Sequence, residues 1–301
     1  MGKASRTKQD PDRRARVAAQ RAAAQRAEQR RRLFMAGGGI VVVILVVVGF
    51  IVFKGKGGGS SAGGVSNGPT GAALTSVVNQ ATSVPAATLD QVGSGSGLVT
   101  GKPSSISGNL LTSRGKPEML YVGAEYCPYC AAERWSMVVA LSRFGTFSGL
   151  STVHSSSIDQ FPNTPTWTFA HATYTSNYLT FSSVEQETNI PLSGNNGYTP
   201  LQNLTPEQQS LVTKYDGANQ GAIPFIDFGN KYMISGSSYT PQILSGHTWA
   251  QIAAALKNPS SQIAKAVDGT ANYITAAICK LTNNQPASAC TPVVKSLEGQ
   301  I

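Results

Sequence analysis

The sequence predicts an α/β domain that follows a single transmembrane helix, and three observations lead to this prediction. Residues 33–53 form a run of 21 residues without a charge, which is long enough to cross a bilayer. Further along, a strand-like run leads into Cys127 and Cys130, and a helix-like run follows at once. About 95 residues later, Ile223-Pro224 begins a pair of short strands that precedes another helix.

The positive charge of the chain is confined to its N-terminal end. The net charge is +9, yet residues 1–35 carry eleven Lys and Arg against three acidic residues, and residues 57–301 sum to about −1. Charged residues make up 13% of the chain, well below the usual quarter. This composition suits an extracytoplasmic domain better than a cytosolic enzyme. No motif in the basic tail supports nucleic-acid binding, so nucleic acid is not expected as a partner.

Residues 33–53 are expected to anchor the protein in the lipid bilayer. At 1.5 Å per residue, a helix of this length spans roughly 30 Å, the thickness of the hydrocarbon core. Three arginines at 30–32 precede the run, whereas only Lys54 and Lys56 follow it. The positive-inside rule therefore predicts a basic cytoplasmic tail, residues 1–32, and an extracytoplasmic C-terminal part of a single-pass cell-membrane protein. A cleavable signal peptide is the alternative, but its apolar core is normally only about 7–15 residues long.

The remainder of the chain divides into a tether and one domain. Residues 54–73 are rich in Gly and Ser, which is typical of a flexible linker. The folded domain is expected over residues 74–301, and its first part, 74–97, reads as a short strand or helix fragment. Within it, residues 159–219 are predicted to be an insertion, and 258–301 a C-terminal helical extension.

The elements of the domain follow from local patterns. Residues 117–124 are an apolar run of strand formers, 130–144 carry a helical apolar stripe, and 149–158 are a second strand candidate. Thr205-Pro206-Glu207 is a helix-start pattern. The remaining elements are two strands within 222–236, joined by a turn at Gly229-Asn230, and helices over 247–258 and 262–281.

The spacing of Cys127 and Cys130 predicts a working dithiol. A thiol attacks only as its thiolate, and a helix N-terminus stabilises a thiolate through unpaired N–H groups and the helix dipole. Pro128 fits the first helical position, where no hydrogen-bond donor is lost. We therefore expect Cys127 to be the exposed, attacking thiol and Cys130 the buried, resolving one. Such a short disulfide loop adds little stability, so function is the better reason for the pair.

A structural zinc site needs four ligands, and the three histidines are isolated, so neither a metal site nor a cofactor is expected.

Two other interpretations of the dithiol stay open. A Cu(I)-handling dithiol is harder to exclude, because Met119 and Met137 lie near the pair in sequence. A binding module without catalytic activity is the second alternative.

Cys279 and Cys290 complete an even number of cysteines. Outside the cytoplasm two such cysteines are expected to form a disulfide. Closing a loop of this length contributes about 2.5–3 kcal/mol on the chain-entropy model, so we predict a structural bond.

The order of strand, CPYC, helix, Ile223-Pro224, paired strands and helix resembles the thioredoxin fold over roughly residues 110–257. More narrowly, YVGAEYCPYCAAERW, LSRFG, FPNTPTWTF and ATYTSNYL resemble an uncharacterised family of membrane-anchored, thioredoxin-like proteins. The first resemblance implies that Pro224 is cis and faces the dithiol. It also implies that Ile223 contacts the substrate backbone, next to Tyr126 and Tyr129.

One position departs from the thioredoxin pattern. Thioredoxin carries a buried acidic residue six positions before its first cysteine, and Tyr121 stands there in this sequence. Glu125 is placed at the exposed rim, as a solvated charge or a group for proton transfer. Glu133 and Arg134 are expected at the surface or in an ion pair, and Trp135 in the core.

Together these features predict a membrane-anchored thiol–disulfide oxidoreductase that acts on exported cysteine-containing proteins. Oxidase or isomerase activity is favoured, because the compartment is oxidising and the proton-relay acid is missing. A membrane or soluble redox partner is then needed to convert the dithiol back to its starting redox state.

Overall fold

A computed structural model describes residues 64, 66–219 and 221–301 of the chain. The predicted cytoplasmic tail and anchor helix, together with residues 54–63 of the tether, lie outside this range. No helix within the described ranges is long and apolar enough to span a bilayer. The first helix begins at Gly71, three residues earlier than the predicted start of the domain.

The domain is a mixed α/β structure built on a mixed sheet. β3 (Lys116–Gly123) is its centre, with β8 (Thr180–Glu185) parallel on one side and β11 (Phe225–Phe228) antiparallel on the other. β12 (Tyr232–Ser235) pairs with the far edge of β11. Two short strands complete the sheet, β1 (Ser104–Ser105) beside β12 and β2 (Thr112–Ser113) beside the start of β3.

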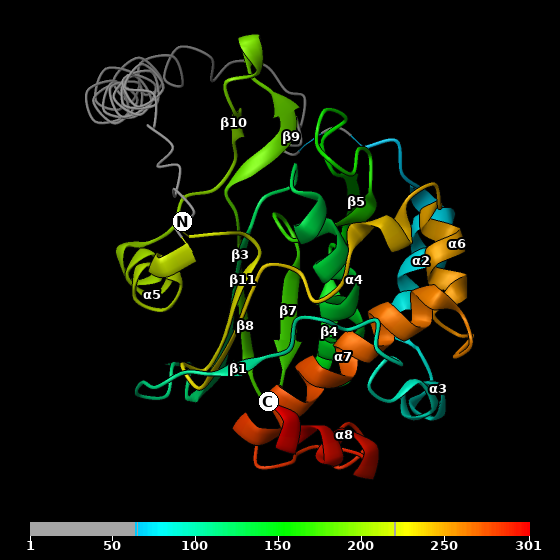
Figure 1. The fold of residues 1–301 in the computed structure, drawn as a ribbon, viewed down its shortest axis with the longest axis vertical. Coiled ribbons are helices and arrows are strands. Elements are labelled where there is room, and N and C mark those ends of the chain that lie inside the picture. Colours follow the sequence, from blue (N-terminus) through cyan, green and yellow to red (C-terminus); the bar gives the residue numbers. More distant parts are fainter. Residues whose placement is uncertain (1–63, 65, 220) are drawn as a thin grey trace, which may run out of the picture. The chain divides into compact units, whose positions relative to one another are not determined.

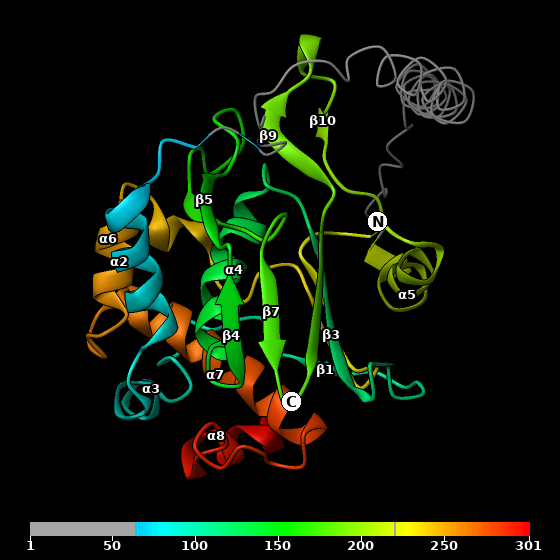
Figure 2. The same cartoon turned by 180° about the vertical axis from the view of Figure 1, so that it is seen from behind.

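Helices cover both faces of the sheet (Figure 1, Figure 2). α4 (Pro128–Leu141) and α7 (Gln262–Leu281) pack against each other on one face and contribute to the larger apolar core. α5 (Pro206–Asp216) lies on the other face, over a smaller apolar cluster that includes Leu120, Val212 and Phe225. The remaining helices on the α4 side are α2 (Gly71–Thr82), α3 (Ala86–Val92), α6 (Trp249–Ala255) and α8 (Pro292–Leu297).

Three strand pairs stand beside the main sheet. They are β4 (Gly145–Ser148) with β7 (Thr173–Ser176), β5 (Ser151–His154) with β6 (Pro165–Thr168), and β9 (Glu187–Pro191) with β10 (Tyr198–Pro200). Figure 1 shows that the β9–β10 pair projects beyond the end of the sheet near the start of α4. Short 3-10 helices lie at Ser193–Asn195, Gly217–Asn219, Pro241–Leu244 and Glu298–Gln300.

Several predicted elements are confirmed. The strand before the dithiol, the helix after it and the two C-terminal helices are present, and Thr205 forms a capping box with Gln208 at the start of α5. The predicted turn at Gly229-Asn230 joins β11 to β12, with φ of 63° and 57°. These are left-handed conformations, which Gly and Asn adopt more readily than other residues.

The candidate strand over 149–158 is present as β5, but it pairs with β6 and takes no part in the main sheet. The parallel neighbour of β3 is β8, which lies inside the predicted insertion at 159–219, so this region is not simply inserted. For residues 74–97, the helical alternative is confirmed, because α2 extends into this range and α3 lies within it.

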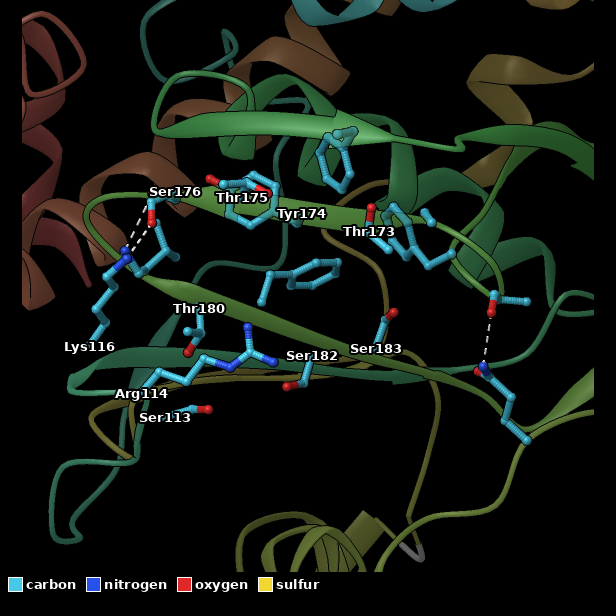
Figure 3. A pocket seen from close by; sticks show the side chains of 17 residues that line it. Ser113, Arg114, Lys116, Thr173, Tyr174, Thr175, Ser176, Thr180, Ser182 and Ser183 are labelled. Atoms are coloured by element: carbon cyan, nitrogen blue, oxygen red, sulfur yellow. Dashed lines mark hydrogen bonds between the residues drawn. The ribbon is translucent and has the colours of Figure 1, made fainter.

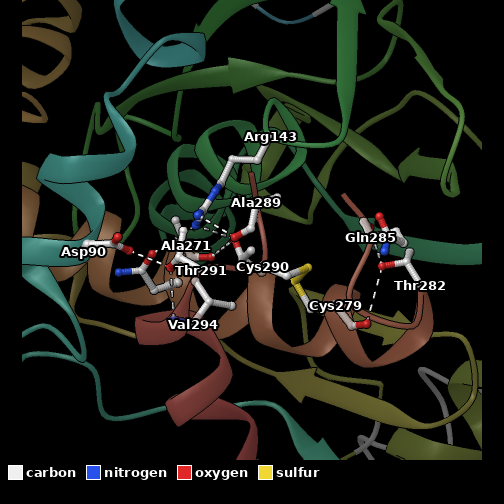
Figure 4. Close-up of a disulfide and its surroundings, with 12 residues drawn as sticks. Asp90, Arg143, Ala271, Cys279, Thr282, Gln285, Ala289, Cys290, Thr291 and Val294 are labelled. Atoms are coloured by element: carbon white, nitrogen blue, oxygen red, sulfur yellow. Dashed lines mark hydrogen bonds between the residues drawn. A yellow bond between two sulfur atoms is a disulfide. The ribbon is translucent and has the colours of Figure 1, made fainter. Parts of the chain in front are cut away.

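The predicted disulfide between Cys279 and Cys290 is present, with a Cα–Cα distance of 5.8 Å (Figure 4). It links the end of α7 to the residue before the cap of α8. Beside it, the Arg143 guanidinium donates to the Ala289 carbonyl at 2.6 Å, and the Thr291 hydroxyl donates to Asp90 at 2.7 Å. The C-terminal extension is thereby attached to α3 and to the segment that follows α4.

Candidate redox site

Cys127 is the N-cap residue of α4, directly after the turn that ends β3. Its Sγ accepts a hydrogen bond from the Cys130 backbone N–H at 3.3 Å, and Pro128 occupies the first turn, where it costs no hydrogen bond. Gly123 is required at the end of the strand because a Cβ there would collide with the Tyr121 hydroxyl and lie 3.1 Å from Cys130 Sγ. The local sequence therefore places one thiol at a helix N-terminus and the second one turn further in.

The two thiols are free and differ in environment. Cys127 is 5% exposed and Cys130 is fully buried, so the expectation of an exposed thiol at Cys127 is wrong. Hydrogen bonds from the Cys130 side chain and backbone lower the pKa of Cys127, and the Arg134 cation lowers it further. Burial, followed by the proximity of Cys127, raises the pKa of Cys130 well above its ordinary value. When one of the two thiols is deprotonated, the thiolate is therefore favoured at Cys127 and the proton at Cys130.

The Ile223-Pro224 peptide bond is cis, as predicted, and it faces the dithiol. The Ile223 carbonyl oxygen lies 3.8 Å from Cys127 Sγ, which places the loop before β11 directly against the cap of α4. Residues 96 positions apart in the chain therefore form one site.

Tyr126 and Tyr129 flank the dithiol on different neighbours. Tyr126 stacks on Tyr198 of β10, with ring centroids 4.0 Å apart and planes at 5°. Tyr129 is 36% exposed, donates from its hydroxyl to Gln160 at 2.9 Å and contacts Phe161 edge to face. Both tyrosines lie next to the dithiol in the chain, but only the Tyr129 side chain is exposed.

Glu125 is buried, so its predicted place at the exposed rim is wrong. Its carboxylate accepts hydrogen bonds from the Thr168 hydroxyl at 2.6 Å and from the Gly64 N–H at 2.7 Å. Burial raises the pKa of Glu125. The contact to Gly64 attaches the first described residue of the tether beside the start of α4.

Arg134 and Glu133 are also buried, so neither lies at the surface; the alternative expectation, an ion pair, is confirmed for Arg134. Arg134 forms a two-pronged ion pair with Glu185 of β8, at 2.8 and 2.6 Å, and donates to the Ala124 carbonyl at 2.7 Å. Glu133 accepts from the backbone and hydroxyl of Ser238, at 2.8 and 3.0 Å. Sequence reasoning missed Glu185 because its partner is 51 residues away and no local pattern connects the two.

A family model described as "Domain of unknown function (DUF929)" matches residues 102–280 of the chain. The chain belongs to the DUF929 family. No curated protein and no solved structure matches it. The matched segment contains both thiols, the cis-proline loop and Glu185, whereas Gly64 and Cys290 lie beyond its ends.

The DUF929 site keeps Trp135 in the core, as predicted, with its ring N–H donating to the Pro165 carbonyl at 2.9 Å. The Tyr121 hydroxyl is buried on the same side of Gly123 as Cys130 Sγ and has no hydrogen-bond partner in the part of the chain that the structure describes. In this chain, the position six residues before Cys127 therefore holds a hydroxyl, buried on the side of Cys130, that pairs with no other group among the described residues.

Proposed function

We propose that this DUF929 protein is an extracytoplasmic thiol–disulfide oxidoreductase, anchored by residues 33–53, that introduces or rearranges disulfides in exported proteins. The observation that carries the proposal is the position of Cys127. Its sulfur caps a helix, has a lowered pKa and lies 3.8 Å from a carbonyl of a cis-proline loop.

The arrangement of the main sheet supports a thioredoxin-like fold. The order β8, β3, β11, β12 has one parallel and two antiparallel neighbours, and the dithiol helix follows the central strand. Thioredoxin-like domains share this order and place a cis proline opposite the CxxC motif. The likeness rests on topology and site geometry.

The proposed reaction is disulfide exchange between the protein and a substrate. In the oxidising direction, a substrate thiolate attacks a Cys127–Cys130 disulfide at Cys127 Sγ and releases the Cys130 thiolate, which takes up a proton. A second substrate thiolate then attacks the mixed disulfide at the substrate sulfur and releases the Cys127 thiolate. Two substrate thiols become one disulfide, and the protein disulfide becomes a dithiol.

The environment of Cys127 favours the oxidising direction. A thiolate that is stabilised in the reduced protein is a good leaving group, and it raises the reduction potential of the pair. Each turnover leaves a dithiol, so a partner with a more oxidising disulfide must accept two electrons and two protons. Isomerisation needs no such partner, because the Cys127 thiolate is regenerated when the substrate rearranges.

Exposed apolar side chains near the dithiol support an unfolded polypeptide as substrate. The described residues include five exposed large hydrophobic side chains, and Tyr129 and Ile158 are two of them. Ile190 and Leu192 are two more, on the projecting β9–β10 pair, which Asn189 attaches to β5 by a 2.8 Å hydrogen bond to the His154 carbonyl. Exposed apolar side chains of this kind are suited to contact apolar segments of an unfolded polypeptide.

The proposal is tested by the reduction potential of the purified protein and by trapping. A Cys130→Ala variant is expected to retain substrates as mixed disulfides through Cys127, and a Cys127→Ser variant is the control that retains none. A potential below about −260 mV would exclude an oxidase. If Cys127→Ser supports normal cellular function, the domain is a binding module. Stoichiometric, tight Cu(I) binding by the reduced protein, without exchange activity, would instead indicate a copper carrier.

A further inference from the structure

A polar pocket lies next to the dithiol, beside Tyr126 and Ile223. Its volume is about 480 Å³, and we call it the Glu187 pocket. Tyr126 precedes the attacking cysteine in sequence, and Ile223 provides the carbonyl that faces Cys127 Sγ. A polypeptide that reacts at Cys127 and passes over Ile223 would bring a neighbouring side chain to this pocket. Its lining residues are Tyr126, Gln186, Glu187, Pro200, Gln202, Asn203, Leu204, Gln209, Gly221 and Ile223.

The charge in the lining of the Glu187 pocket is negative. Glu187 is its single charged side chain, and the other polar side chains are a tyrosine and neutral amides. In the described part of the chain, the Glu187 carboxylate has no ion pair or side-chain hydrogen bond, so its charge is uncompensated within the pocket. A carboxylate among amide oxygens accepts hydrogen bonds from an ammonium or guanidinium group.

A larger cavity, about 530 Å³, lies between β7 and β8 and has the opposite character (Figure 3). Its charged lining residues are Arg114 and Lys116. Gln202 lines both cavities, but neither Tyr126 nor Ile223 lines the larger one. Charge and position therefore both distinguish the Glu187 pocket as the one suited to a cationic group of a substrate.

We propose that the Glu187 pocket binds a lysine or arginine side chain of the substrate polypeptide, close to the reacting cysteine. This inference rests on the exchange activity proposed above and adds a substrate preference to it. Tyr126, held in place by its stacking on Tyr198, forms one wall, and Glu187 provides the charge that selects the cation.

The test measures exchange between the full chain, oxidised at its dithiol, and reduced peptides that contain two cysteines. The peptides are identical except for one residue beside the first cysteine, which is Lys, Gln or Glu. We expect the second-order rate constant for the Lys peptide to exceed that for the Gln peptide about five-fold, since a partly exposed ion pair contributes up to about 1 kcal/mol. The preference should decrease as salt is added.

Variants assign the preference to the pocket. Glu187→Gln should bring the Lys-to-Gln ratio close to one, whereas Glu207→Gln, which removes an equal charge outside the pocket lining, should leave the ratio unchanged. Gln209→Lys places a cation in the pocket on an exposed helical position and should favour the Glu peptide, so the test stands even if Glu187→Gln fails to fold.

The outcomes separate the two proposals. Equal rates with all three peptides would overturn the cation preference and leave the exchange activity standing. A Lys preference that persists in Glu187→Gln would overturn the assignment to this pocket. Failure of the oxidised protein to exchange with any peptide would overturn the proposed function, and the preference with it.

Discussion

Glu133 gives the sharpest test of how the buried charges of this domain affect its stability. The side chain lies in α4, is fully buried and accepts two hydrogen bonds, both from Ser238. Burial raises the pKa of Glu133 from 4.5 to about 7, more than the hydrogen bonds from Ser238 lower it. The perturbation is Glu133→Gln, which keeps the shape of the side chain and removes the ionisable group.

The raised pKa fixes the sign of the pH dependence. Between pH 4.5 and about 7 the folded protein holds a proton at Glu133 that the unfolded chain has released, so the free energy of unfolding decreases as pH rises. The full contribution is present below pH 4.5 and is lost once pH exceeds the folded pKa. At 1.36 kcal/mol per pKa unit, the loss amounts to about 3 kcal/mol. The glutamine variant has no such loss.

Urea unfolding of both proteins across this pH range provides the measurement. We expect equal stability at the acidic end and a variant that is more stable by up to about 3 kcal/mol above pH 7. Other groups titrate in the same range, Asp227 among them, but they cancel in the difference between the two proteins. A constant difference across the whole range would refute the reasoning, because it would mean that Glu133 keeps an ordinary pKa.

Three further predictions concern named contacts. Arg134→Met should lower the free energy of unfolding by about 3–5 kcal/mol, because it leaves the Glu185 carboxylate buried without its cation. The double variant Arg134→Met, Glu185→Leu should recover most of that loss, as measured by urea unfolding. Replacing Cys279 and Cys290 together by Ala should cost about 2.5–3 kcal/mol in calorimetry and leave the rate of disulfide exchange unchanged. Gly123→Ala should cost about 1–3 kcal/mol and slow exchange with a model peptide, because the added methyl group has no space beside the buried thiol.

The parts of the structure that the sequence predicted well are those with local signals. The apolar stripe of α4, the capping pattern at Thr205 and the turn at Gly229-Asn230 each involve residues only a few positions apart. The two cysteines and Pro128 likewise specify the cap of α4 without any distant contact. Such patterns depend on helix and turn geometry, which is the same in every fold.

The burial of Glu125, Glu133 and Arg134 could not be predicted, because it depends on distant partners. Those partners are Thr168, Ser238 and Glu185, which lie 43, 105 and 51 positions away. A charged residue after a CxxC motif is usually solvated, and only the tertiary fold decides otherwise. The strand β8 was missed for a related reason, since its sequence TFSSVE is largely polar and only two of its six residues are buried.

The concentration of buried charge at the start of α4 is difficult to explain by stability alone. A buried ion pair such as Arg134–Glu185 often contributes less to stability than apolar residues of the same volume would. The guanidinium, however, lowers the pKa of Cys127, and a cation acts more strongly on a thiolate when both are shielded from water. Glu185 orients Arg134 through two hydrogen bonds while the Ala124 carbonyl holds the same guanidinium next to the β3–α4 turn. We therefore interpret the ion pair as a support of the Cys127 thiolate, the state that the proposed exchange reaction needs.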